Sequence, residues 1–497
     1  MSDPVAALPP ELVEKILSPL TLPDLLNCSL VSKLWHNTTN NNNILWKNLC
    51  ISRGWKSCHE FDDCINNFLS FDAKDRQQME GFAEWKKYFI LKNRVKDNWM
   101  NGKYRKVETA VPPDVCEGSC YTMSTSTVAV GTFNGLVKLF DIRNDDFRLI
   151  QTIQFKNPYS FSDIRLSSEH LVFCDEFHLF VYKLNESGTY TFCTMKVIGE
   201  KEVLTITDAS NLVGDRDADS SDNLGGPCRA HDIKGLEFCL NDDFLVAVNL
   251  LSRGILVWDL QESPLLEIEH VFERGEGTAI NSFCLMDDQL SASFIINTKT
   301  NDHVTDIEEY HWFFEAYSLK HNSRMYRSET LYEGTSPMAA YIETNNSYTV
   351  NGIFYHESST IHIYFFDRTT GRLIYQRFAD FVDITAYPEN TDFVAILKNE
   401  FMIMYNPKTD CTLYTIELQG MFTNIYNYVL VTLCEEHDNV GKTRSKLEFW
   451  RLKNAQPTDD YIHMTVLPQY HNCHVACNDS GILFRGPGSL FLIHFVV

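Results

Sequence analysis

The stretch FLVAVNLLSRGILVWDL, residues 244–260, contains two short apolar runs separated by a polar turn. The runs FLVAVNLL (244–251) and ILVWDL (255–260) have the length and composition of buried β-strands. Gly254, just before the second run, is a typical turn residue. The stretch therefore predicts a pair of antiparallel strands joined by a tight turn.

The same unit recurs along the chain after residue 103. Each copy has a second apolar run that follows another apolar strand after a polar turn. These second runs are LVKLFDI (136–142), LFVYKL (179–184), ILVWDL (255–260), WFFEAYSL (312–319), IHIYFFD (361–367), FMIMYNP (401–407), KLEFWRL (446–452) and LFLIHFV (490–496). The repeats average roughly the forty to fifty residues of a four-stranded propeller blade. We therefore expect an all-β propeller, with eight blades favoured and seven as the alternative.

The last repeat lacks an outer strand of its own. The chain ends on LFLIHFVV (490–497), and a blade left in this state exposes an apolar edge that favours aggregation. Residues 104–111 precede the first repeat and alternate between apolar and polar side chains. We expect them to pair with the last strand and close the ring.

A helical pattern precedes the repeats. Between residues 8 and 49, Leu, Ile, Val and Trp recur every three or four positions, and the polar run 37–43 interrupts them. A domain of about forty residues seldom builds a stable core alone, so its apolar side chains should pack against another surface. The patterns together predict an α+β multidomain chain with a helical domain at 1–50, a helical linker at 51–102 and the propeller at 103–497.

Composition narrows the classes of function. The 497 residues carry a formal net charge of −23, which argues against general nucleic-acid binding because that needs a basic surface. No apolar run reaches the length of a membrane span, and residues 1–11 show no signal-peptide pattern. Fifteen cysteines without framework spacing favour a reducing compartment. We expect a cytoplasmic or nuclear protein without membrane or nucleic-acid partners.

The first helical domain resembles an F-box. The shared features are Leu8-Pro9, an apolar helix at 11–17, Leu22-Pro23-Asp24-Leu25, Val31 followed by Trp35, and Leu45-Trp46. Further along, residues 85–89 (WKKYF), Asn98-Trp99 and Gly102 resemble the linker of F-box/WD-repeat proteins. In the repeats, only Trp258-Asp259 keeps the terminal Trp-Asp pair of that family.

This resemblance implies a role in ubiquitin transfer. In the F-box family the leucine-rich helices bind a Skp-type adaptor, which joins them to a cullin scaffold carrying the ubiquitin-transfer enzyme, while the propeller binds the protein target. The residues that would face the adaptor, or support that face, are Leu8, Pro9, Leu12, Ile16, Leu20, Leu25, Leu26, Leu30, Val31 and Trp46. Two alternatives stay open: a helical hairpin docked on its own propeller, and an interaction scaffold that acts without a ligase.

Patterns for catalysis and metal binding are weak. The densest ligand-like cluster lies at 470–477, but in a strand Cys473 and Cys477 share one face while His474 points to the other. We interpret the cluster as buried thiols beside a polar histidine. His231-Asp232 is typical of a hydrogen-bond network within a WD repeat. We expect no metal, no cofactor and no catalytic residue; a propeller enzyme is the third alternative, because fold does not fix function.

Five basic residues lie in turns between the second and third strands of the repeats. They are Arg253, Lys398, Lys442, Arg444 and Arg485. Related F-box/WD proteins bind targets on the face where these turns open, and arginine pairs well with phosphate. We therefore expect an acidic or phosphorylated protein target. The alternative is a set of ordinary solvated charges, which Asp217 and Asp219 on the same face favour.

Overall fold

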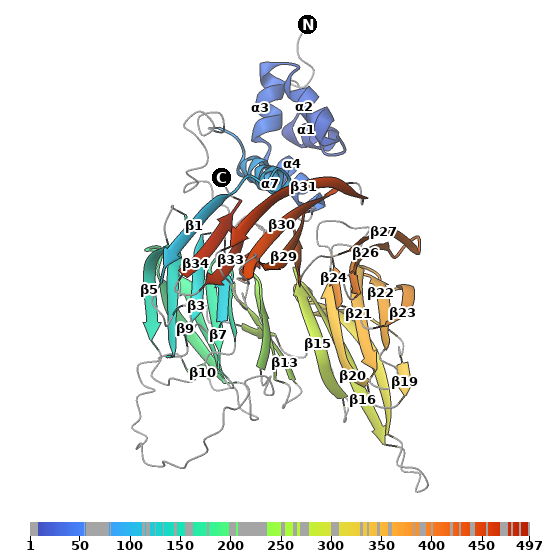
Figure 1. Ribbon diagram of the computed structural model, residues 1–497. Coiled ribbons are helices and arrows are strands. Elements are labelled where there is room, and N and C mark those ends of the chain that lie inside the picture. Colours follow the sequence, from blue (N-terminus) through green and yellow to red (C-terminus); the bar gives the residue numbers. More distant parts are fainter. Residues whose placement is uncertain are drawn as a thin grey trace.

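The computed structural model describes a helical part followed by a β-sheet part (Figure 1). The described residues are 8–53, 55, 79, 81–111, 115, 120–124, 126–132, 134–143, 147–154, 163–175, 178–197, 205–206, 236–249, 254–261, 266–268, 278–299, 308–328, 332–334, 337–344, 348–355, 360–380, 383–386, 394–398, 401–417, 421–426, 429–437, 443–453, 456–467, 476–478, 481–486 and 489–495. Arg253, Lys442 and the residues His231, Asp232 and 470–475 lie outside these ranges.

In the described residues, the helical part begins with four short helices and ends with a longer one. They are α1 (Pro10–Leu17), α2 (Leu22–Ser29), α3 (Lys33–Asn41), α4 (Asn43–Ser52) and α7 (Glu84–Met100). Polar side chains set two of the starting points. Ser32 Oγ accepts a hydrogen bond from the Trp35 amide at 3.2 Å, and Asn42 Oδ1 accepts one from the Leu45 amide at 3.0 Å. Such caps satisfy amides that have no partner within the helix.

The polar run 37–43, which interrupts the apolar pattern, contains the boundary between two helices. Helix α3 continues to Asn41, and α4 begins at Asn43. Thr39 and Asn40 are buried within this run. The Thr39 carbonyl accepts a hydrogen bond from the Trp46 indole at 2.7 Å, and the Asn40 side chain accepts one from the Lys86 ammonium. Tertiary contacts of this kind override the low helix propensity of asparagine.

The strands of the described residues form eight antiparallel sheets of four or five strands each. The blades are, in order, β2 (Cys120–Met123), β3 (Thr127–Gly131), β4 (Leu136–Asp141) and β5 (Arg148–Gln154); β6 (Asp163–Leu166), β7 (His170–Cys174), β8 (His178–Leu184), β9 (Tyr190–Val197) and β10 (Thr205–Ile206); β11 (Leu236–Leu240), β12 (Phe244–Asn249), β13 (Gly254–Asp259) and β14 (Leu266–Ile268); β15 (Thr278–Met286), β16 (Gln289–Lys299), β17 (Glu308–Ser318), β18 (Ser323–Arg327) and β19 (Tyr332–Gly334); β20 (Pro337–Thr344), β21 (Tyr348–Tyr355), β22 (Thr360–Asp367) and β23 (Leu373–Asp380); β24 (Asp383–Ala386), β25 (Val394–Lys398), β26 (Phe401–Asn406) and β27 (Cys411–Glu417); β28 (Met421–Tyr426), β29 (Val429–His437), β30 (Thr443–Lys453) and β31 (Gln456–Leu467); and β32 (Ala476–Asn478), β33 (Gly481–Gly486), β34 (Ser489–His494) and β1 (Arg105–Ala110).

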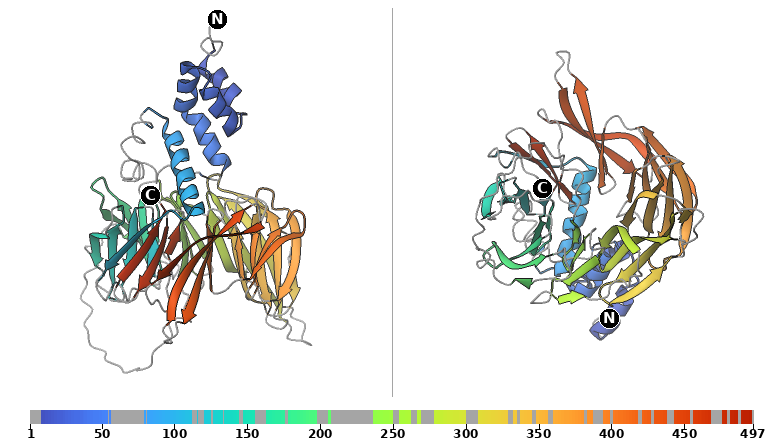
Figure 2. Two further views of the ribbon diagram at one scale, coloured as in Figure 1. Left: turned by 45° about the horizontal axis from the view of Figure 1, so that its top comes forward. Right: turned by 90° about the horizontal axis from the view of Figure 1, so that it is seen from below.

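The sheets follow one another around a ring, and the first strand in sequence closes it (Figure 2). β1 pairs with β34 from Arg105 opposite His494 to Ala110 opposite Ser489. The expected closing strand is therefore confirmed, as is the preferred architecture of eight blades. Arg105 also donates a hydrogen bond to the Ile142 carbonyl at 3.0 Å, so the closing strand reaches the first blade as well.

The ring has two faces that differ in what they carry. β1 is the fourth strand of its blade and starts directly after α7, so the turns between third and fourth strands lie on the α7 side. Because the strands within a blade are antiparallel, the turns between second and third strands lie on the opposite side. In Figure 1 the helical part stands above the ring, and these second–third turns point away from it.

Side-chain hydrogen bonds join neighbouring blades on the α7 side. Ser168 Oγ of the second blade donates to Asp242 of the third at 2.6 Å. Asn241 of the third blade donates to the Asp287 carbonyl of the fourth at 2.6 Å, and Arg368 of the fifth blade donates to the Asp287 carboxylate at 2.7 Å. These bonds therefore connect the second to the fifth blades on this side of the ring.

Candidate functional site

The first four helices expose a set of large apolar side chains. Leu30 is 81% exposed and Val31 is 66% exposed, and both lie at the end of α2. Leu12 and Ile16 on α1 and Leu26 on α2 are exposed as well. Apolar side chains in such number on one small helical unit mark a surface that binds another protein. We call Leu12, Ile16, Leu26, Leu30 and Val31 the apolar face.

The structure separates the ten predicted adaptor-binding residues into three groups. The apolar face holds five of them, and Pro9 is also exposed, while Leu8 and Leu20 are half-buried. Leu25 is fully buried among Val13, Leu17 and Leu45. Trp46 is 1% exposed, so it and Leu25 can only support the surface from within.

Three further exposed side chains were missed by the sequence reasoning. Leu34 lies on α3, and Ile44 and Ile51 lie on α4. Ile44 and Ile51 are seven positions apart, a spacing that places both on the same side of a helix. That signal was present in the sequence, but apolar periodicity does not tell which side of a helix another element covers.

The N-terminal half of α7 completes the core of the helical domain. Trp85 and Phe89 are buried in one cluster with Trp46 and Cys50 of α4. The Trp46 and Phe89 rings have centroids 5.2 Å apart. Removal from water of this much aromatic surface is the main attraction between α7 and the helices before it.

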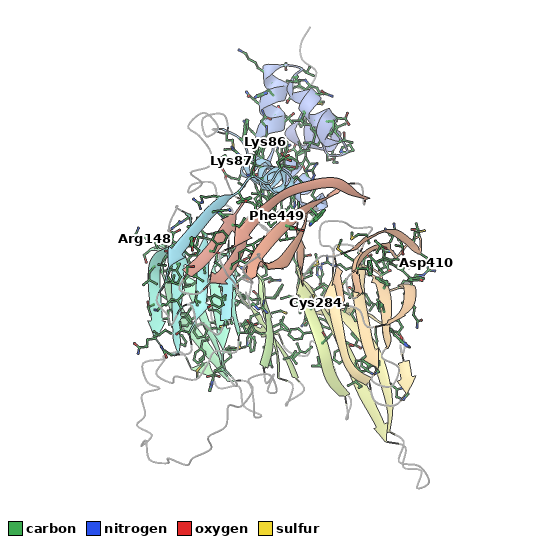
Figure 3. The ribbon with its side chains drawn as sticks, viewed as in Figure 1. Lys86, Lys87, Arg148, Cys284, Asp410 and Phe449 are labelled. Atoms are coloured by element: carbon green, nitrogen blue, oxygen red, sulfur yellow. The ribbon has the colours of Figure 1, made fainter. Side chains whose placement is uncertain are left out.

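The C-terminal half of the same helix belongs to the core of the ring. Leu91, Val95 and Trp99 pack with Phe449 of β30 and with Phe495, which follows β34. The Trp99 and Phe495 rings are stacked with centroids 3.6 Å apart. At about 1.5 Å per residue, the 17 residues of α7 form a rod of roughly 25 Å whose two ends lie in two different cores. In Figure 3, Lys86 and Lys87 lie near the upper helices and Phe449 lies in the sheets.

Lys86 is buried where α7 meets the helical domain. Its ammonium lies 3.8 Å from the centroid of the Phe82 ring and 5.2 Å from that of the Trp46 ring, and it donates to Asn40 Oδ1. Burial lowers the pKa of Lys86 to about 8, because the charged form loses its hydration. The aromatic faces and the amide oxygen partly replace that hydration.

The predicted target-binding residues that fall within the structure occupy equivalent places. Lys398 ends β25 opposite Phe401, Arg444 lies near the start of β30, and Arg485 lies near the end of β33. All three flank turns between second and third strands, on the side of the ring away from α7. Their backbone positions agree with a shared face, while their side chains lie outside the described part of the structure.

In the residues that the structure covers, no group of three or more His, Cys, Asp or Glu side chains is placed to hold a metal ion. None of the described helices is long and apolar enough to cross a membrane.

A closed ring of eight antiparallel sheets, joined to a helical unit with an exposed apolar face, defines a β-propeller protein with an added helical domain. Residues 5–52 match the model of the F-box-like family. The chain thus combines an F-box-like domain with a propeller, as the sequence predicted.

Two proteins of known family are similar to this chain over part of its length. One is "Probable E3 ubiquitin ligase complex SCF subunit sconB" of Arthroderma otae, which is 26% identical over 157 residues, or 28% of this chain and 23% of that protein. The other is "F-box only protein 48" of Homo sapiens, which is 27% identical over 123 residues, or 24% of this chain and 69% of that protein. The match to the first relative thus spans under a quarter of its length.

Solved structures of similar shape include two propellers of distant sequence. Sqt1 of Saccharomyces cerevisiae has a TM-score of 0.44 at 9% identity and covers 78% of this chain and 98% of its own. The Dos1 propeller has a TM-score of 0.46 at 11% identity and covers 80% of this chain and 96% of its own. The propeller assignment rests on the strand order given above.

Proposed function

We propose that this chain is a substrate receptor of a Skp–cullin–F-box type ubiquitin ligase. The F-box-like domain binds the adaptor, and through it the cullin scaffold, while the propeller binds the protein that is to be ubiquitinated. The observation that carries the proposal is the apolar face of a domain that matches the F-box-like family. The chain acts in the cytoplasm or nucleus and needs no cofactor. Its domain boundaries lie at about residues 50 and 102, as the sequence predicts.

The mechanism in this proposal is proximity and needs no catalytic side chain. A target bound to the propeller is held at a high effective concentration near the transfer enzyme. The effective concentration is highest when the segment that connects the two binding sites has a matching length and little conformational freedom. Helix α7, with Trp85 and Phe89 in one core and Val95 and Trp99 in the other, supplies such a connection.

The first prediction tests the adaptor surface. Changing Leu26, Leu30 and Val31 together to Ala is expected to weaken adaptor binding by about 10²–10⁴-fold, because central apolar contacts contribute about 1–2 kcal/mol or more each. The fold should survive, since all three side chains are exposed. The measurement is co-purification and titration with a purified Skp-type adaptor.

A control uses three exposed apolar residues on the ring. The triple change of Leu149, Met325 and Leu373 to Ala should leave adaptor binding unchanged. If the apolar-face variant captures the adaptor as well as the unaltered chain does, the receptor proposal is wrong. An interaction scaffold independent of a ligase then becomes the better description.

The second prediction concerns the target. Arg444→Glu with Arg485→Glu is expected to weaken the capture of acidic or phosphorylated proteins by about tenfold or more, since reversed charges repel the groups that arginine attracts. Adaptor binding should be retained. The readout is quantitative interaction proteomics with the proteasome inhibited. The control reverses Lys320 and Arg372, which are exposed in third–fourth turns on the α7 side. An unchanged set of captured proteins in the first variant would refute the target-face assignment.

A further inference from the structure

The asparagine run 40–43 lies where the F-box-like domain meets α7, and it bonds to the start of that helix. The Ala83 amide donates to the Asn40 carbonyl at 3.0 Å, and the Trp85 amide donates to Asn43 Oδ1 at 3.1 Å. The Lys86 ammonium donates to Asn40 Oδ1. Three groups at the N-terminus of α7 thus form hydrogen bonds with Asn40 and Asn43.

These bonds supply a helix cap from a different helix. Ala83 is the capping residue of α7, and its side chain has no oxygen with which to accept a hydrogen bond. An asparagine side chain is among the best acceptors for the first amides of a helix. Asn43, at the first turn of α4, performs this task for α7 from 42 positions earlier in the sequence.

Apolar packing and hydrogen bonding constrain this contact in different ways. The Trp46, Trp85 and Phe89 cluster attracts α7, but apolar attraction has no preferred direction. Hydrogen bonds weaken steeply when the donor and acceptor leave alignment. Directional bonds to α7 therefore come from the asparagines at its start and from Arg53, whose guanidinium donates to Asn93 Oδ1 at 3.0 Å further along the helix.

We propose that Asn40 and Asn43 form an orientation joint, which fixes the angle between the F-box-like domain and the ring. The two are positioning residues for ubiquitin transfer, and that part of the inference rests on the proposed function. Lys86 strengthens the joint, because its buried ammonium needs the Asn40 oxygen that the aromatic rings cannot replace.

The joint can be tested by its effect on orientation alone. Spin labels are placed at Lys33 on α3 and, in separate samples, at Arg148 or Arg372 on the ring, all of which are exposed. The labels are attached to unnatural amino acids, since the chain has fifteen cysteines. In the unaltered chain both label pairs should give narrow distance distributions. Asn43→Ala should broaden both by at least about twofold, because α7 then lacks its directional cap.

Two variants act as controls. Asn43→Asp keeps an acceptor at the same place and should restore the narrow distribution, since Asp caps as well as Asn does. Asn41→Ala changes an exposed asparagine of the same run that makes none of the three bonds, and it should match the unaltered chain. Asn40→Ala is less informative because it also leaves the buried Lys86 without its acceptor.

The outcomes separate the joint from the receptor proposal. A distribution in Asn43→Ala as narrow as in the unaltered chain would overturn the joint. A broad distribution together with normal adaptor binding and a normal melting temperature supports it, because a purely stabilising residue would lower the melting temperature without loosening the angle. If the unaltered chain fails to bind the adaptor, the receptor proposal falls while the distance result for the joint still stands.

Discussion

A chain carrying Val107→Asp is expected to lose its closed ring and to unfold or aggregate. Val107 is 3% exposed in β1 and packs in one cluster with Val128, Leu490 and Leu492, which belong to the blades on either side of the closure. A carboxylate there has no described cation partner in this apolar cluster. The destabilisation should be about 4 kcal/mol or more, a large part of the stability of a typical domain.

The matched control lies next to it in the same strand. Glu108 is exposed, and Glu108→Lys should change the free energy of unfolding by no more than about 0.5 kcal/mol. Size-exclusion chromatography and urea unfolding compare the two variants. A monomeric Val107→Asp chain with the unfolding midpoint of the unaltered chain would contradict closure by β1.

The ring could be predicted from sequence because its determining features are local. In the third blade, Leu245 to Val248 form a continuous buried run in the second strand, and Val257 and Trp258 are buried in the third. Strands covered on both sides need such runs, and turns need polar or glycine residues, so each blade carries its own signal. Closure by residues 104–111 follows from the same alternation, since a ring cannot leave one edge open.

The helical domain shows where this kind of reasoning stops. Trp46 was predicted to face the adaptor or to support that face, and the sequence did not distinguish between the two. It is buried because Trp85 and Phe89, 39 and 43 positions later, cover it. Apolar periodicity identifies the covered side of a helix only if the covering element is already known.

The contacts of the asparagine run could not be predicted from the sequence for a related reason. Asparagine favours turns because its side chain competes for backbone hydrogen bonds. Here the Asn40 side chain is occupied by Lys86 and that of Asn43 by the Trp85 amide, so both serve a contact between distant segments. The sequence showed only a polar interruption of the apolar pattern at the place where these contacts form.

The last prediction concerns the end of α7 that lies in the ring. Trp99→Ala should lower the free energy of unfolding by about 3–5 kcal/mol, because Trp99 is fully buried and stacked on Phe495. Urea unfolding followed by circular dichroism measures the loss, and Trp99→Phe, which keeps a ring in place, should recover part of it. The apolar face should still bind the adaptor in native buffer, since Trp99 lies outside the core of the helical domain. An unfolding midpoint equal to that of the unaltered chain would mean that α7 rests beside the ring without contributing to its core.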